Sequence, residues 1–186
     1  MKIFTKNISI LLALVFTMSF NVNSQEIGDI YEGGYIFQIN EDGTGLVADL
    51  QDLGEMNWGD AMSAAESATS QGYYDWYLPS LEELTLMYNT IGNGGLEGNV
   101  GGFNTDSNPY YWSSSEAEAN NNYAWDVYFV NGITSGLNKE DPYSVRVIRS
   151  VTFTPSCDDP EISWVGDQNG DGFISEWDGI TYINME

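Results

Sequence analysis

The chain has 186 residues, with 28 acidic residues against five basic ones, no histidine and a single cysteine. The lack of histidine excludes His-based catalytic triads and the usual zinc sites, and one cysteine cannot form an internal disulfide. So acidic a chain repels nucleic acid and anionic lipid at long range, and we expect neither as a partner.

The first segment of the chain, residues 1–24, has the organisation of a secretory signal peptide. Lys2 and Lys6 form a basic start, an apolar run over residues 8–20 follows, and Ser24 is a small residue at the cut. The apolar run is shorter than an ordinary membrane span, which favours cleavage over a membrane anchor. We therefore expect a secreted or cell-surface protein without a membrane span in its mature part. That part keeps three basic residues against 28 acidic ones, a formal charge of −25.

The mature chain begins with the pattern of a β-hairpin. GYIFQIN over 34–40 alternates apolar and polar residues, EDGTG follows as turn chemistry, and LVADL over 46–50 forms the return strand. Apolar residues at helical spacing then predict a helix from about 58 to 70, with Asn57 as its cap and Gly72 as its end.

The segment GYYDWYLPSLEELTLMYN, over 72–89, predicts a second helix preceded by a cluster of aromatic rings. Ser80 and Glu83 have the spacing of a capping box, and the apolar stripe that follows ends at Gly92. Glu82 and Glu83 lie in the first turn, where the helix dipole favours carboxylates. We therefore favour a structural role for this pair over a catalytic dyad.

A Gly- and Asn-rich loop over 92–109 precedes a set of strands, and loops of this length are often functional or mobile. The predicted strands are YYWSSSE over 110–116, YAWDVYF over 123–129 and YSVRVIRSV over 143–151. Early helices and late antiparallel strands predict an α+β domain over 25–152. A linker over 153–163 follows, in which Cys157 is expected to be an incidental free thiol; an intermolecular bridge is the alternative.

Several of these segments together resemble the C-terminal domain of Lcl-type collagen-like bacterial adhesins. The resemblance covers about 28–151 and rests above all on DWYLPSLEEL, YWSSSE and VRVIRS. It implies a C-type-lectin-like fold and a non-enzymatic role in ligand binding or adhesion. Tyr77 stands where the family usually has arginine. Because the chain is strongly negative, we do not transfer the sulfated-polysaccharide ligand associated with those adhesins.

Aromatic and polar side chains provide the candidate ligand surface. Large aromatic residues mostly pack in cores, and we expect this of most tryptophans in the family motifs. A tyrosine hydroxyl tolerates water, so tyrosines before the second helix are better candidates for stacking on a sugar ring. The predicted ligand-binding residues are Tyr73, Tyr74, Tyr77, Ser114, Glu116, Asn121 and Asp126.

A glycosidase is the enzymatic alternative, since such an enzyme needs only carboxylates, here Glu82, Glu116 or Asp126. Two carboxyl groups about 5–10 Å apart across a groove would support it. We expect instead a non-enzymatic module that recognises a glycan or a surface protein.

The segment DQNGDGFISEWD has the ligand spacing of an EF-hand calcium loop, with Gly172 at the sharp turn. Oxygen ligands at these intervals suit Ca²⁺, a hard cation. The predicted ligands are Asp167, Asn169, Asp171, Phe173 through its carbonyl, Ser175 and Asp178. The loop and following helix, over 164–186, also resemble half of a dockerin module. Dockerins carry two such repeats, so we favour a calcium-stapled cap over docking to a cohesin-like partner, which remains the assembly-protein alternative.

Overall fold

The structure is a computed structural model that describes residues 25–117 and 121–153, and this part of the chain is a mixed α+β domain. The predicted signal peptide and calcium loop lie outside the described residues. The elements are β1 (Ile30–Tyr31), β2 (Gly34–Ile39), β3 (Thr44–Asp49), β4 (Gly54–Met56), α1 (Trp58–Glu66), a 3-10 turn η1 (Ser70–Gly72), α2 (Leu81–Ile91), β5 (Tyr110–Glu116), β6 (Tyr123–Tyr128), β7 (Ile133–Asn138), β8 (Tyr143–Val145) and β9 (Ile148–Thr152).

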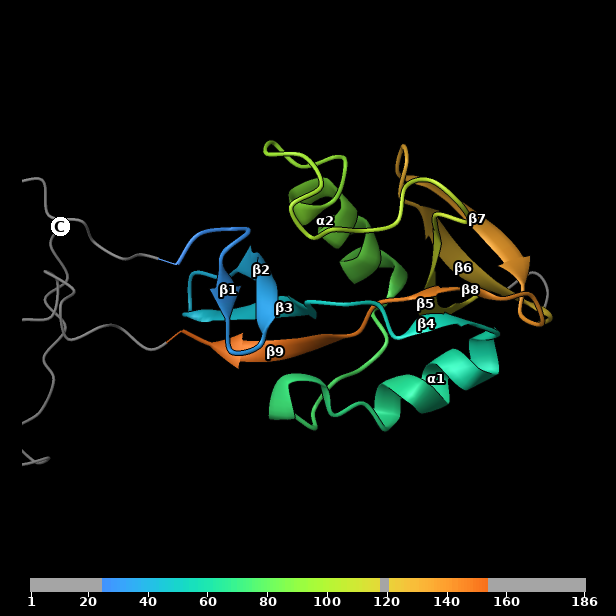
Figure 1. Ribbon diagram of the computed structural model, residues 1–186, viewed down its shortest axis with the longest axis horizontal. Helices are drawn as coiled ribbons and strands as arrows, with labels where there is room; N and C mark the ends of the chain where they lie inside the picture. The colour runs from blue at the N-terminus through green and yellow to red at the C-terminus, as the bar shows by residue number, and fades with distance from the viewer. Residues whose placement is uncertain (1–24, 118–120, 154–186) are drawn as a thin grey trace, which may run out of the picture. The chain divides into compact units, whose positions relative to one another are not determined.

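The strands form two sheets, with α1 on one side of them and α2 on the other (Figure 1). The four-stranded sheet has the order β1-β2-β3-β9, and the five-stranded sheet has the order β4-β8-β5-β6-β7. Strand pairs are antiparallel, except that β5 and β8 run parallel. The predicted hairpin is confirmed as β2 and β3.

Two hydrophobic cores result from the alternation of side chains along the strands. Ile36 and Trp112 pack in the core that includes α1, which we call the α1 core. Their sequence neighbours Phe37 and Tyr111 pack in the core that includes α2, the α2 core. Because successive side chains of a strand point to opposite faces, a single strand can serve both cores.

Both helices begin where the sequence predicts. Ser80 accepts a hydrogen bond from the Glu83 N–H, and the Glu83 carboxylate accepts one from the Ser80 N–H, so the capping box of α2 is complete. Asn57 caps α1. The predicted extension of α1 to residue 70 is wrong, because the helix ends at Glu66. Ser67 caps this end with a non-helical ψ of 1°, and its hydroxyl donates to the carbonyls of Ser63 and Ala64.

The segment predicted as one strand over 143–151 is two strands in different sheets. β8 pairs with β4 and β5, whereas β9 pairs with β3. Arg146 and Val147 form the crossover between them. A continuous Val-rich run satisfies both sheets equally well, so its composition does not mark the point where the chain changes partners. The sequence also gave no prediction of β7, which lacks a clear apolar alternation.

Candidate functional site

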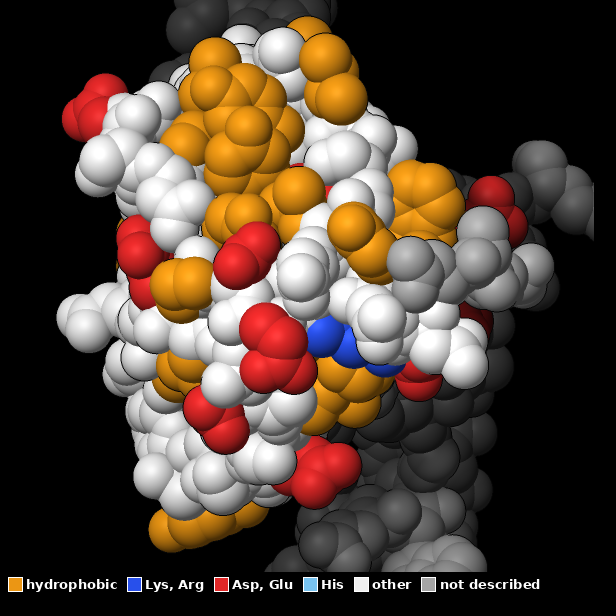
Figure 2. Space-filling view, turned by 90° about the vertical axis from the view of Figure 1, so that its right-hand side faces the viewer, with side chains coloured by type: hydrophobic (Ala, Val, Ile, Leu, Met, Phe, Trp, Pro, Cys, Tyr) orange, Lys and Arg blue, Asp and Glu red, His pale blue; other side chains and the backbone are white. Residues whose placement is uncertain are grey.

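Lys139 illustrates how the three basic residues beyond residue 24 are used. Its Nζ lies 2.7 Å from the Glu116 carboxylate and 4.3 Å from the centre of the Trp58 ring. On the face drawn in Figure 2, acidic side chains border the small basic area that reaches the surface. This lysine is therefore already paired inside the domain.

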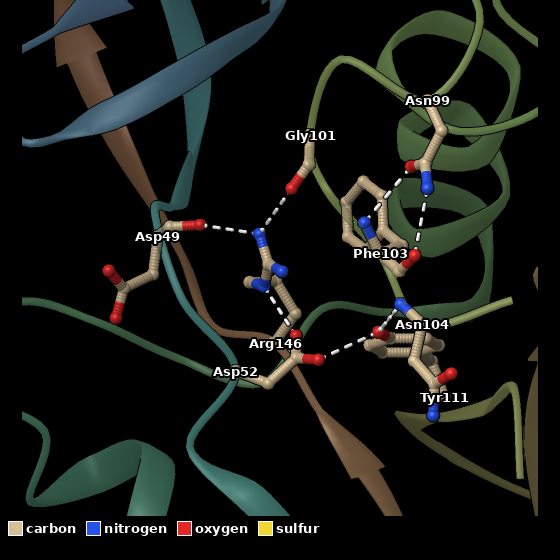
Figure 3. Close-up of polar contacts among 8 residues, drawn as sticks. All are labelled: Asp49, Asp52, Asn99, Gly101, Phe103, Asn104, Tyr111 and Arg146. Atoms are coloured by element: carbon tan, nitrogen blue, oxygen red, sulfur yellow. Dashed lines mark hydrogen bonds and ion pairs between the residues drawn. The ribbon is translucent and has the colours of Figure 1, made fainter. Parts of the chain in front are cut away.

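Arg146, at the crossover between β8 and β9, holds three segments together (Figure 3). Its Nε donates to the Asp52 carboxylate at 2.6 Å, and its Nη1 donates to the carbonyls of Asp49 and Gly101 at 2.8 and 3.0 Å. The guanidinium lies 4.4 Å from the centre of the Phe103 ring. With only 2% of its surface exposed, Arg146 ties the long Gly-rich loop to the strands and does not face a ligand.

Further contacts fix the same loop from the α2 side. The Tyr111 hydroxyl donates to Asp52 and accepts from the Asn104 N–H, both at 2.7 Å. Burial, together with the nearby Asp52 carboxylate, raises the pKa of Tyr111. The Asn99 side chain bonds both the N–H and the carbonyl of Phe103 (Figure 3). The loop is thus anchored by specific side chains at several points along its length.

Arg149 is the third basic residue, and it organises the segment before α2. Its Nε donates to Asp75 at 2.8 Å, and its Nη1 donates to the Glu32 carbonyl at 3.0 Å. The guanidinium lies 3.8 Å from the centre of the Tyr73 ring. The hydrogen bond from Arg149 lowers the pKa of Asp75. All three basic side chains beyond residue 24 therefore have acidic partners within the domain.

The predicted ligand-binding tyrosines before α2 differ in their availability. Tyr73 lies against Arg149. Tyr77 exchanges two backbone hydrogen bonds with Ile148, and its hydroxyl donates to Glu83 at 3.0 Å. Burial, with the Glu83 carboxylate next in effect, raises the pKa of Tyr77 to about 12. Tyr74, in contrast, is 77% exposed.

The other predicted ligand-binding residues lie on or beside β5 and β6. The Ser114 N–H donates to the Pro79 carbonyl, and Glu116 pairs with Lys139. Asn121 is exposed, and Asp126 is completely buried. The structure thus divides the predicted set between the segment before α2 and the β5–β6 pair.

Strand register assembles a second group of aromatic rings, which the sequence did not single out. Tyr110 on β5 lies directly opposite Tyr128 on β6, with ring centres 4.6 Å apart. The ring of Tyr143 on β8 lies 5.5 Å from Tyr110 and 5.0 Å from Trp112. All three tyrosines are partly exposed, whereas Trp112 is buried. We call Tyr110, Tyr128 and Tyr143 the tyrosine surface.

The tyrosine surface lies on the side of the five-stranded sheet that faces the α1 core. Trp112 and Ala124, on this face, pack against Ala61 of α1 and belong to that core. Ile133, paired with Tyr128 on the edge strand β7, is 60% exposed. Tyr143 packs against the border of the α1 core, and all three tyrosines remain partly exposed, so an aromatic area is left on this face of the sheet.

Asp126 lies on the same face as the tyrosine surface, between Trp112 on β5 and Ser135 on β7. The Ser135 hydroxyl donates to its Oδ1 at 2.8 Å, whereas its buried Oδ2 has no hydrogen-bond partner among the described residues. Burial raises the pKa of Asp126 to about 6, although the Ser135 hydrogen bond acts in the opposite direction. The protonation state of the Asp126 carboxyl group, beneath this surface, should therefore change at mildly acidic pH.

The part of the chain that the structure describes contains no group of three or more His, Cys, Asp or Glu side chains arranged to hold a metal ion. No helix within 25–117 or 121–153 is long and apolar enough to cross a membrane.

The structure is thus an acidic α+β domain. Its basic side chains are paired internally, and one face of its five-stranded sheet carries partly exposed tyrosine rings. Comparison with protein families shows a match to the Lcl C-terminal domain over residues 38–149. This match covers more than half of the chain, so the protein belongs to that family. Membership indicates an extracellular module of the adhesion type, and the family is not known for enzymatic activity. The comparison with curated proteins finds no match.

Proposed function

We propose that the protein is an exported, non-enzymatic recognition module that binds an uncharged glycan through the tyrosine surface. The carrying observation is the contact between three partly exposed tyrosine rings on one face of a sheet. Sugar rings have apolar faces that stack on aromatic side chains, and the tyrosine hydroxyls remain available to water and to sugar hydroxyls. The signal peptide predicted over 1–24 accounts for export, and a C-type-lectin-like fold is the architecture that the family resemblance implies.

The charge distribution supports an uncharged ligand. The mature chain has a formal charge of −25, and its three basic side chains are engaged by Glu116, Asp52 and Asp75. A sulfated polysaccharide would therefore meet a repulsive field without a free cation to neutralise it. A neutral glycan avoids this cost.

Binding to arrayed neutral and sulfated glycans, followed by titration of the best neutral ligand, tests the proposal. Each stacked ring contributes about 1 kcal/mol, so Tyr128→Ala should weaken binding by about fivefold. Tyr74→Ala is the matched control, since Tyr74 is exposed outside the tyrosine surface. Far-UV circular dichroism checks that both variants are folded.

Three results would contradict this assignment. Equal affinity of Tyr128→Ala and the wild type would exclude the tyrosine surface, and loss of binding in Tyr74→Ala would return the site to the residues before α2. Cell binding that survives enzymatic removal of glycans would identify a surface protein as the ligand.

The proposal also includes a calcium site over 167–178, outside the described residues. The spacing of oxygen ligands supports it, and extracellular sites of this kind bind calcium at about 10⁻⁴–10⁻³ M. Isothermal titration calorimetry should show uptake by the wild type and its loss in Asp167→Ala. Asp159→Ala, which changes an acidic residue before the loop, should retain uptake. A wild-type chain that takes up no calcium would remove this part of the proposal.

A further inference from the structure

The four-stranded sheet has an open edge along β9. β9 is the last strand of this sheet, and β3 is its neighbouring strand. The pairing between Thr44–Ala48 and Ile148–Thr152 runs without a register shift. Edge strands are often blunted by a bulge, a charged side chain or a proline. β9 has no bulge and no proline, and its one charged side chain, Arg149, is paired with Asp75 and Glu32. β9 therefore presents a regular template for another strand.

The backbone groups of β9 alternate between its inner and outer sides. The Phe153 N–H donates at 2.8 Å to the turn before β3, whereas Ile148 exchanges two hydrogen bonds of 2.9 Å with Tyr77 on the outer side. Ser150 and Thr152 share the parity of Ile148, so their N–H groups also point outward. Over residues 25–117 and 121–153, neither N–H has a hydrogen-bond partner. Ile148 is thus paired on the outer side, whereas the Ser150 and Thr152 N–H groups are unpaired among the described residues. The Thr152 carbonyl accepts a hydrogen bond of 3.1 Å from the Tyr31 hydroxyl.

A groove of about 630 Å³ is lined by residues of both β3 and β9. Ser150 and Thr152 line it together with Asn40 and Thr44, whose side chains are short and polar. Such a lining leaves space for an added backbone and offers hydrogen bonds to it. The groove therefore includes the two residues that carry the free N–H groups, and it extends across β9 onto β3.

Charge decides what kind of segment fits this edge. Arg149 also lines the groove, but Asp75 and Glu32 already bind its guanidinium. A second copy of the mature chain would bring a further charge of −25 and would be repelled. A segment with basic side chains is attracted to the same body, and strand addition lets its backbone pair with Ser150 and Thr152.

We infer that the outer edge of β9 binds an extended, basic segment of a partner protein by strand addition. The segment continues along β9 the pairing that Tyr77 makes with Ile148. This edge belongs to the four-stranded sheet, whereas the tyrosine surface lies on the five-stranded one, so the inference is independent of glycan binding.

Amide hydrogen exchange on the mature chain, with a synthetic peptide of alternating lysine and threonine, tests the inference. In the free protein, the Ser150 and Thr152 amides should exchange much faster than the Val151 amide, which faces β3. Saturation with the peptide should slow both outer amides by about tenfold or more, as expected for newly formed sheet hydrogen bonds. A peptide with the same charge but proline in place of threonine controls for non-specific attraction, because proline cannot donate to the edge.

Two variants separate the backbone of the edge from its side chains. Ser150→Pro removes the outward N–H and should weaken binding of the lysine–threonine peptide by about fivefold, the effect of one hydrogen bond. Ser150→Ala keeps the N–H and should bind like the wild type. If Ser150→Pro does not fold, the exchange measurement on the wild type still decides the question.

Several results would overturn the inference. Slow exchange of the Ser150 and Thr152 amides in the free mature chain would mean that the edge is already occupied. Equal binding of the proline peptide would reduce the interaction to charge alone. Protection that appears elsewhere on the domain would place the peptide on another surface.

Discussion

Tyr110 and Tyr111 are neighbours on β5, yet the two faces of the five-stranded sheet use them differently. Tyr111 is fully buried in the α2 core, and its hydroxyl bonds Asp52 and Asn104. Tyr110 is partly exposed and contacts the rings of Tyr128 and Tyr143. The same residue type therefore stabilises the domain on one face and forms a surface on the other.

The difference between these faces comes from what covers them. On the α2 side, Phe103 from the long loop joins α2 over the sheet, and Arg146 holds that loop in place. On the α1 side, the helix packs on Trp112, and the rings beyond it remain partly open. Aromatic content alone therefore does not reveal a binding surface, because the reach of the covering elements decides which rings are available.

Removing the anchor on the covered face should have the largest effect. Arg146→Ala leaves Asp52 and two carbonyls without their buried donor, and breaking a buried pair in this way costs about 3–5 kcal/mol. Urea unfolding measures the loss. Lys139→Ala is the control for a more exposed pair and should cost about 1 kcal/mol or less. Equal losses in the two variants would contradict the structural role of Arg146.

The pH dependence of stability tests the carboxylate beneath the open face. Because the folded state raises the pKa of Asp126 from 3.8 to about 6, it binds more protons than the unfolded state between these values. Stability should therefore fall as pH rises from about 4 to 6, by up to about 3 kcal/mol, and this loss should then stay constant.

Asp126→Asn should remove this part of the pH dependence while retaining the general repulsion among acidic residues. Asp75, whose pKa is lowered by Arg149, acts in the opposite direction and loses its contribution only as pH falls below about 4. Urea unfolding of the wild type and of Asp126→Asn between about pH 4 and 6 isolates the contribution of Asp126 to the free energy of unfolding. Parallel pH profiles would contradict the raised pKa of Asp126.

The smallest expected effect compares the two neighbouring tyrosines directly. Tyr111→Phe removes a buried hydroxyl with two hydrogen-bond partners and should cost about 1–3 kcal/mol. Tyr110→Phe removes a hydroxyl from the partly open face and should change the free energy of unfolding by less than about 0.5 kcal/mol. Thermal unfolding of both variants measures the contrast, and a larger loss in Tyr110→Phe would reverse the assignment of the two faces.

Local signals predicted much of the fold. Ser80 and Glu83 predicted the start of α2, and Gly43 in the EDGTG turn predicted the β2–β3 hairpin. These features depend on residues close in sequence, whose hydrogen bonds form within one turn. The division of 143–151 between two sheets depends on distant strands and was missed for that reason.

The candidate site shows the same limit. Tyr74 fits the sequence-based expectation of an exposed ring. The ring of Tyr73, in contrast, lies against Arg149, and the hydroxyl of Tyr77 is bonded to Glu83. Tyr110 and Tyr143 are far apart in the chain and meet only because β8 lies beside β5. The pattern of apolar and polar residues within β5 or within β8 does not predict that these two rings come into contact.

By itself, the sequence determined the family, the charge, the helix caps and the alternation of each strand, because these properties belong to single residues or near neighbours. The tertiary structure decided that all three basic side chains beyond residue 24 are paired and that three distant tyrosines form one surface. It also decided that the outward N–H groups of Ser150 and Thr152 on β9 have no partner among the described residues. Those outcomes depend on which strands become neighbours and on where the covering helices end, and only the packed chain fixes both.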